Sequence, residues 1–229
     1  MSVLDVGCGT GAITSGIARA VAPGGHVVGF DRDETHLSAA RKEHAALANL
    51  SFEQGDATSL PYCGQFDIVT AARTLQWIAS PGRAVIAMKE AAKTGGIVVV
   101  LDYSHVRNSW EPDPPPAFRR FYEAFLAWRR ANLWDNEMAD HLPALFREAG
   151  LTGIESHVQD EVVRRGDADF DERGALWAEV IDNVGGPIAK GGFCTEAQVV
   201  DAREQYGPWV KTELATQTLS MRTVTGRVP

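Results

Sequence analysis

A glycine-rich segment at the start of the chain constrains the fold more than any other feature of the sequence. The segment Val3-Leu4-Asp5-Val6-Gly7-Cys8-Gly9-Thr10-Gly11-Ala12-Ile13-Thr14 begins with an apolar run suited to a buried parallel strand. Three alternating glycines then let the backbone turn sharply and let a ligand approach it closely. A helical pattern follows, and the free N–H groups at its start favour an electronegative ligand group. The segment predicts a strand, a ligand-binding turn and a helix that ends near Val21.

Two classes of ligand use such a turn, and the glycine spacing alone does not separate them. Gly7-x-Gly9-x-x-Ala12 satisfies the dinucleotide pattern, and Asp31 follows roughly 20 residues later, where a ribose-binding acid is expected. Asp5 favours the other class, because a carboxylate two residues before the first glycine would repel a pyrophosphate and suits a cationic ligand. A glycine turn of purely structural use is a third alternative.

The pattern Asp5-x-Gly7-x-Gly9-x-Gly11 closely resembles the first motif of class I S-adenosylmethionine (SAM) dependent methyltransferases. In that family this turn embraces the amino-acid end of the cofactor. The resemblance implies cofactor contacts from Asp5, from the three glycines and from Thr14.

A second predicted strand, 26–30, delivers Asp31 at its carboxyl end, which is the edge where open parallel sheets bind ligands. A carboxylate there can accept both hydroxyls of a ribose, so we expect Asp31, with its neighbour Arg32, to contact the cofactor. A structural role for Asp31 is the alternative. Asp33 is explained as the N-cap of a helix that extends to about Leu47.

A third predicted strand, 50–54, leads into Gly55-Asp56-Ala57-Thr58-Ser59-Leu60-Pro61. This segment resembles the part of the methyltransferase family that reads adenine. The resemblance implies that Asp56 accepts from the exocyclic amine and that the N–H of Ala57 meets a ring nitrogen. An aspartate in an ordinary turn is the competing interpretation.

The fourth predicted strand, 66–72, is followed by Arg73-Thr74-Leu75-Gln76-Trp77-Ile78. In the family, residues here flank the methyl group that is transferred, which implies cofactor contacts from Ala72 and Arg73 and a substrate contact from Trp77. Many relatives carry a histidine near Gln76 or Trp77, and this chain does not. The Leu-Gln-Trp triplet resembles methyltransferases of small carboxylic acids, but three residues do not fix a substrate.

A helix from Ser80-Pro81 to about Ala92 and a fifth strand, 97–102, complete five strands that alternate with helices, which predicts a doubly covered parallel sheet. The resemblance to the small-molecule methyltransferases of ubiquinone and menaquinone biosynthesis covers residues 2–102. It implies an α/β, Rossmann-like, doubly wound and mostly parallel sheet of seven strands, with an antiparallel last strand between the fifth and the sixth.

The remaining chain departs from this alternation, and we expect one methyltransferase domain, 1–229, with a SAM-binding core, 1–102. Helical insertions at 103–136 and 166–213 are expected to form the substrate side. Residues 152–165 predict the sixth strand and 216–228 the last strand. A helix of about 170–184 is expected to break at Gly185-Gly186-Pro187. The final long helix, which a capping box at Thr195 opens, is expected to be interrupted at Gly207-Pro208.

Aromatic residues recur on one face of the helical pattern after Pro116, among them Phe118 and Tyr122. Packing of an amphipathic helix on the core accounts for the spacing. The position after the fifth strand also suits a lid or a pocket wall, so Tyr103, Phe118 and Tyr122 join Trp77 as candidates for the substrate pocket.

Histidine is the side chain best suited to take a proton from a hydroxyl acceptor near neutral pH. His105 follows the fifth strand at the ligand edge, and His141 opens a later helix. We expect His105 ahead of His141 as a catalytic base, with hydrogen bonding of both to loop backbone as the alternative. The transfer itself asks little of a protein, because a sulfonium methyl is already activated.

Composition limits the partners and the location. A net charge of −8 disfavours nucleic acid, so we expect a small-molecule methyl acceptor. No apolar run approaches the roughly 20 residues of a membrane span, and we expect a cytoplasmic protein with no membrane insertion, as a monomer or a homodimer. Three scattered cysteines fit reduced thiols and predict no metal site.

Two further expectations concern the start of the chain and the rival functions. Family members usually place a helical segment before the first strand, where this chain begins, so we expect either that this segment is missing or that an insertion covers the cofactor. A nicotinamide-dependent oxidoreductase and a non-catalytic SAM-binding protein are the rival functions.

Overall fold

The computed structural model describes all 229 residues, which form two compact units. The first unit comprises residues 1–103, 138–158 and 222–229, and the second comprises residues 104–137 and 159–221. The chain thus leaves the first unit twice and returns to it each time.

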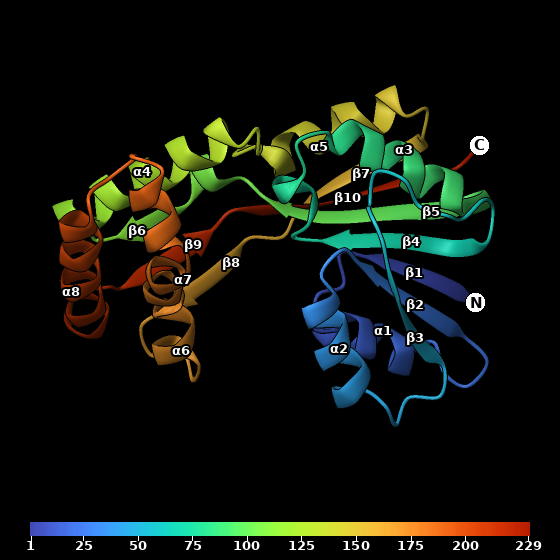
Figure 1. The fold of residues 1–229 in the computed structure, drawn as a ribbon, viewed down its shortest axis with the longest axis horizontal. Coiled ribbons are helices and arrows are strands. Elements are labelled where there is room, and N and C mark those ends of the chain that lie inside the picture. Colours follow the sequence, from blue (N-terminus) through green and yellow to red (C-terminus); the bar gives the residue numbers. More distant parts are fainter. The chain divides into compact units, whose positions relative to one another are not determined.

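The first unit is built on a seven-stranded sheet with helices around it (Figure 1). Its elements are β1 (Ser2–Val6), α1 (Ala12–Ala20), β2 (His26–Asp31), α2 (Glu34–Glu43), β3 (Leu50–Gln54), β4 (Phe66–Ala72), the 3₁₀ helix η1 (Leu75–Trp77), α3 (Pro81–Ala91), β5 (Ala92–Tyr103), α5 (Met138–Glu148), β7 (Thr152–Val158) and β10 (Met221–Arg227).

The strand order in this sheet is β3-β2-β1-β4-β5-β10-β7. The pairs β1–β2, β1–β4, β2–β3 and β4–β5 are parallel, and β10 pairs antiparallel with β7. The prediction of a doubly wound, mostly parallel sheet with an antiparallel last strand between the fifth and the sixth strands of that sheet is confirmed.

Alternating side chains of β1 face two different helical layers. Leu4 and Val6 join a core with α3 and α5, whereas Val3 joins a smaller cluster with Ala18 of α1. All four of these side chains are buried. Because helices cover both faces, ligands can reach the sheet only at its edges and ends, and the carboxyl ends of the parallel strands carry the predicted site.

The second unit contains a three-stranded antiparallel sheet, β6-β9-β8, together with helices. Its elements are the 3₁₀ helix η2 (His105–Arg107), β6 (Ser109–Glu111), α4 (Pro116–Ala131), β8 (Glu161–Arg164), α6 (Phe170–Gly174), α7 (Leu176–Lys190), α8 (Glu196–Thr212) and β9 (Thr216–Leu219). No helix of the chain has both the length and the apolar character needed to cross a membrane.

Two long strand predictions were wrong, because each segment contributes to two sheets. Residues 152–165 form β7 and β8, and residues 216–228 form β9 and β10. At the division, the backbone N–H of Met221 donates to Oδ1 of Asp160 at 2.8 Å. Both halves of each segment have a strand-like composition, so the sequence indicates a strand in each and does not show which sheet it joins.

Two predicted helix breaks were also wrong. Helix α7 continues through Gly185-Gly186-Pro187, and α8 continues through Gly207-Pro208. A Cβ on Gly185 would lie 2.5 Å from Cγ1 of Val199 in α8, so the glycine there permits close packing of the two helices. This packing offsets the local cost of glycine and proline within a helix. The predicted capping box at Thr195 is confirmed.

Candidate functional site

The turn after β1 adopts a conformation that requires glycine. Gly7, Gly9 and Gly11 have φ angles of 73°, 54° and 81°. A Cβ on Gly7 would lie 2.3 Å from Oγ1 of Thr74, whereas a Cβ on Gly9 would meet no atom within 4 Å. The turn is therefore closed by protein at Gly7 and open at Gly9, which leaves the backbone of Gly9 accessible to a ligand.

The carboxyl group of Asp31 lies next to this turn at the end of β2. Its Oδ2 accepts a hydrogen bond from the backbone N–H of Gly9 at 2.9 Å, and its Oδ1 accepts one from the N–H of Asp33 at 2.9 Å. Each carboxylate oxygen can accept a second hydrogen bond. Asp31 is thus fixed in orientation and retains acceptor capacity for a ligand.

Asp5 lies beneath the glycine turn and is 3% exposed. Oγ1 of Thr14, in the first turn of α1, donates a 2.6 Å hydrogen bond to its Oδ2. Burial raises the pKa of Asp5 to about 6, although the Thr14 hydrogen bond opposes the shift, and the nearby charge of Asp31 adds to it. A buried carboxylate without a cation nearby is costly, so a cationic ligand group at this turn would favour its ionised form.

Asp56 and Arg32 come together at the ends of β3 and β2. Oδ1 of Asp56 accepts hydrogen bonds from the backbone N–H and from Oγ1 of Thr58, both at 2.8 Å. These bonds lower the pKa of Asp56, and the positive charges of Arg32 and Arg83 contribute to the shift. Asp56 is solvent-exposed, whereas Ala57 packs against the main core. The carboxylate of Asp56 is thus ionised and held at the sheet edge.

The end of β4 carries Ala72, which is half-buried, and then Arg73, whose φ angle of 57° is uncommon for a residue with a side chain. The backbone N–H of Arg73 donates to the carbonyl of Leu101 at 2.7 Å and continues the pairing with β5. Oγ1 of Thr74 donates to the carbonyls of Ala72 at 3.1 Å and Gly7 at 3.4 Å. This turn therefore contacts the glycine turn directly.

The remaining candidates divide between the two units. Trp77, Tyr103 and His141 belong to the first unit, where Trp77 is 37% exposed and His141 is exposed on α5. His105, Phe118 and Tyr122 belong to the second unit.

His105 is buried within the second unit, at 6% exposure. Its ring packs edge-on against Phe125 and Trp177, with centroids 5.4 and 6.4 Å apart, and its backbone N–H donates to the carbonyl of Asn136 at 2.7 Å. Burial, together with the charge of Arg129, holds the pKa of His105 well below its usual 6.5. A buried, weakly basic imidazole supports a packing role more than proton transfer near neutral pH.

Phe118 and Tyr122 lie in an aromatic cluster around Trp177. Phe118 is fully buried and stacks on Tyr206, with ring centroids 4.3 Å apart. The hydroxyl of Tyr122 donates to the carbonyl of His105 at 2.6 Å. The indole N–H of Trp177 is buried without a hydrogen-bond acceptor, and it is surrounded by aromatic rings. Packing accounts for the helical periodicity of these aromatic residues.

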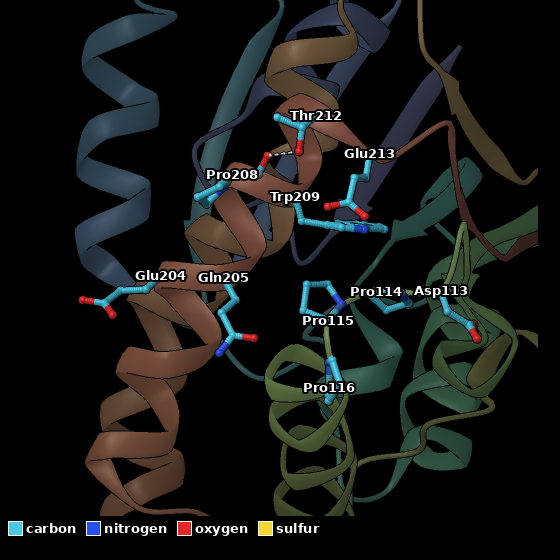
Figure 2. A pocket seen from close by; sticks show the side chains of 10 residues that line it. All are labelled: Asp113, Pro114, Pro115, Pro116, Glu204, Gln205, Pro208, Trp209, Thr212 and Glu213. Atoms are coloured by element: carbon cyan, nitrogen blue, oxygen red, sulfur yellow. Dashed lines mark hydrogen bonds between the residues drawn. The ribbon is translucent and has the colours of Figure 1, made fainter.

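A shallow groove of about 580 Å³ lies within the second unit, between the start of α4 and the second half of α8 (Figure 2). In Figure 2 the indole of Trp209 lies between Glu213 and Pro115. The groove is lined by Asp113, Pro114, Pro115, Pro116, Glu204, Gln205, Pro208, Trp209, Thr212 and Glu213. None of the predicted site residues lines this groove.

The sequence does not identify three residues at the carboxyl ends of the parallel strands or beside the glycine turn. Thr74 contacts Gly7, as described above, and Nε2 of His44 lies 3.2 Å from the carbonyl of Thr10. Asp102, which is 0% exposed, accepts the backbone N–H of Gln76 at 3.1 Å. Only Asp102 left a signal in the sequence, as a third acid at the carboxyl end of a predicted parallel strand.

Comparison with known proteins identifies the family. A family model described as a methyltransferase domain matches residues 1–150. Demethylmenaquinone methyltransferase of Lactococcus lactis is 31% identical over 172 residues, which are 68% of this chain and 67% of that protein. Its counterpart in Staphylococcus carnosus is 29% identical over 171 residues, which are 66% of this chain and 68% of that protein.

A solved structure shares the fold. Phosphoethanolamine N-methyltransferase 2 of Haemonchus contortus, in complex with phosphomonomethylethanolamine and S-adenosylhomocysteine, matches with a TM-score of 0.62 at 16% identity. The match covers 100% of this chain and 49% of that chain. These comparisons give no support to a nicotinamide-dependent oxidoreductase or to a non-catalytic protein. The chain belongs to the methyltransferase domain family and is a class I SAM-dependent methyltransferase.

Proposed function

We propose that this enzyme transfers the methyl group of SAM to a small quinone-type acceptor, of the class named by demethylmenaquinone in its relatives. The similarity to those relatives extends over 172 residues and thus beyond the cofactor core. The net charge of −8 further disfavours a nucleic acid as acceptor. The observation that carries the cofactor part of the proposal is the contact between Gly9 and Asp31.

Asp31 binds the ribose of SAM in this proposal. The N–H groups of Gly9 and Asp33 orient its carboxylate, and each oxygen keeps acceptor capacity for one ribose hydroxyl. Arg32 lies beside it at the same strand end. The open space at Gly9 lets the cofactor approach this pair closely.

The adenine is bound at the end of β3. Thr58 engages only Oδ1 of Asp56, so Oδ2 can accept the exocyclic amine. The backbone N–H of Ala57 is proposed to donate to a ring nitrogen.

The amino-acid end of SAM lies at the glycine turn, above Asp5 and Thr14. Ionised Asp5 attracts the cationic amine of SAM, and the hydroxyl of Thr14 orients the carboxylate of Asp5. Gly7 and Gly11 shape the turn. Ala72 and Arg73, at the end of β4, lie nearer the sulfonium methyl, and Trp77 faces the acceptor.

The transfer is an in-line displacement. A nucleophilic atom of the acceptor forms a bond to the methyl carbon while the bond from carbon to sulfur breaks, and S-adenosylhomocysteine leaves as a neutral thioether. The positive charge of the sulfonium passes to the acceptor as the new bond forms, which makes the departing proton strongly acidic, so it can leave to water. The enzyme therefore mainly positions the reactants and excludes water from the sulfonium.

The test is incubation of the purified chain with SAM and either the reduced or the oxidised form of demethylmenaquinone. Release of S-adenosylhomocysteine together with a methylated quinone, detected by mass spectrometry, supports the proposal. Phosphoethanolamine, small carboxylic acids and total RNA serve as competing acceptors. Turnover of any of these in preference to the quinone would show that the acceptor class is wrong.

A further inference from the structure

We propose that Asp102 is a positioning residue, whose buried carboxyl group fixes the turn at residues 73–77, here called the β4 turn, against which the methyl acceptor binds. This inference rests on the proposed function and extends it to a residue at the end of β5.

The first observation is the burial of Asp102 and the identity of its partners. The side chain is 0% exposed. Oδ2 accepts the backbone N–H of Gln76 at 3.1 Å, and Oδ1 accepts the N–H of Tyr103 at 2.9 Å. A backbone N–H in a turn at a sheet edge can be satisfied by water, so pairing it with a buried carboxyl group contributes a fixed geometry.

The second observation is that the β4 turn adopts an uncommon conformation that needs such support. Arg73 has a φ angle of 57°, and Nε2 of Gln76 donates to the carbonyl of Arg73 at 3.3 Å. Gln76 is itself buried, at 2% exposure. Asp102 therefore holds the backbone of Gln76, and the side chain of Gln76 holds the left-handed residue three positions earlier.

The third observation is that the β4 turn also contacts the glycine turn after β1. Oγ1 of Thr74 donates to the carbonyl of Gly7 at 3.4 Å, and Thr74 fills the space that a Cβ on Gly7 would need. Leu75 is anchored in the main core, whereas Trp77 remains 37% exposed. The β4 turn is thus held at three points and presents one large apolar side chain.

This arrangement predicts a selective effect on the acceptor. Asp31, Asp56 and Asp5, which hold the groups of SAM in the proposed function, lie on other strands from Asp102. Loss of the contact from Asp102 to Gln76 should therefore displace the β4 turn and lower turnover of the acceptor much more than the affinity for SAM, to which only Arg73 of that turn is proposed to contribute. Misplacement of reacting groups by about 1 Å can cost up to roughly a hundredfold in rate.

The informative variant is Asp102→Asn, because the amide keeps the volume and one acceptor oxygen but cannot accept both N–H groups. Asp67→Asn is the matched control. Asp67 lies at the opposite end of β4, where its Oδ2 accepts the N–H of Ser2 at 2.6 Å and its Oδ1 accepts Nζ of Lys93 at 2.6 Å. The Asp67→Asn substitution therefore removes a hydrogen-bonded carboxylate from the pair of strands β4 and β5 without changing the β4 turn. Asp102→Glu, which restores a carboxyl group on a longer side chain, tests whether the position of that group matters.

Three measurements decide the proposal: amide hydrogen exchange of the segment from Arg73 to Ile78, SAM affinity by calorimetry, and steady-state kinetics with the reduced quinone. In Asp102→Asn we expect faster exchange at Gln76, a value of kcat/KM for the acceptor that falls about tenfold or more, and a much smaller change in the SAM Kd. Asp67→Asn should leave all three at wild-type values. Asp102→Glu should not restore kcat/KM, because the longer side chain displaces the carboxyl group.

Unchanged exchange at Gln76 would overturn the proposal, and so would wild-type kcat/KM in Asp102→Asn. A parallel loss of SAM affinity, melting temperature and turnover would assign Asp102 a merely structural role. If the wild-type enzyme binds SAM and methylates no quinone, the proposed function fails instead, and the exchange measurement then decides the role of Asp102 by itself.

Discussion

The backbone N–H of Gly9 donates a 2.9 Å hydrogen bond to Oδ2 of Asp31, which joins the turn after β1 to the end of β2. One contact therefore connects the two sequence motifs that are predicted separately to bind the amino-acid end and the ribose of the cofactor. Asp33 holds the other oxygen of the same carboxyl group. The orientation of Asp31 is thus set before SAM arrives, which reduces the entropy lost on binding.

Replacement of Asp31 by alanine should weaken SAM binding. Loss of hydrogen bonds to a charged acceptor costs about 1.5–3 kcal/mol, which is roughly ten- to a hundredfold in Kd. Isothermal titration of the variant with SAM measures the change.

The neighbouring Asp33→Ala is the matched control for this experiment. Asp33 caps α2 by accepting the N–H groups of Thr35 and His36, so its loss should lower the melting temperature and spare the SAM Kd. An Asp31→Ala protein that is folded by circular dichroism and binds SAM as tightly as the wild type would contradict the ribose assignment.

SAM affinity should depend on pH through Asp5. The pKa of this buried carboxyl group is about 6 in the free protein, and the cationic amine of SAM favours the ionised form. Affinity should therefore rise with pH up to about 6 and level off above it, with proton release on binding at lower pH. Calorimetry between pH 5 and 8 in buffers of different ionisation enthalpy measures both effects, and Asp5→Asn should abolish the pH dependence.

The same group should destabilise the free protein at neutral pH. The folded-state pKa of about 6 lies above the ordinary 3.8, so the stabilising contribution of Asp5 is complete below pH 3.8 and is lost as the pH rises through 6. At pH 7 the difference amounts to about 3 kcal/mol. The Asp5→Asn variant should thus need more urea to unfold at pH 7 than the wild type. Equal urea midpoints would show that burial does not raise the pKa of the Asp5 carboxyl group.

Substitutions of two glycines in the turn, Gly7 and Gly9, should differ in their main effect. Gly9→Ala costs roughly 1–2 kcal/mol of backbone strain because φ is 54°, but its Cβ meets no protein atom, so we expect a folded protein with weak SAM binding. Gly7→Ala forces a Cβ to within 2.3 Å of Oγ1 of Thr74 and should lower stability much more. Adding Thr74→Ala should recover part of that loss. Thermal melts and SAM titrations of the three variants compare them, and tight SAM binding by Gly9→Ala would place the cofactor elsewhere.

His105→Ala should lower stability without changing the pH profile of turnover. Its imidazole is buried beside Phe125 with a lowered pKa, so its removal leaves a cavity that costs about 2–4 kcal/mol. We expect kcat between pH 6 and 9 to keep its wild-type shape at saturating SAM. Loss of a kinetic pKa in this variant, with the corresponding His141→Ala unchanged, would restore His105 as the base.

The parts of the site that follow from the sequence are those that local rules fix. Gly7, Gly9 and Gly11 were predicted to form a turn because no other residue adopts positive φ as readily, and the structure has all three at positive φ. Asp31 and Asp56 were placed at one edge of the sheet because parallel strands end at the same edge. The capping box at Thr195 lies outside the site, but a local pattern of four residues also predicts it, because its partners are neighbours in the chain.

The parts that only the tertiary structure decided depend on contacts between distant residues. The Gly-Pro sequence in α7 does not break the helix because Gly185 packs against Val199 of another helix. The role of Asp102 depends on Gln76, in a separate loop, and the weak basicity of His105 depends on burial beside Arg129. Burial removes water and so sets both the geometry of a carboxyl group and the pKa of an imidazole, and burial is a property of the packed chain that no short stretch of sequence carries.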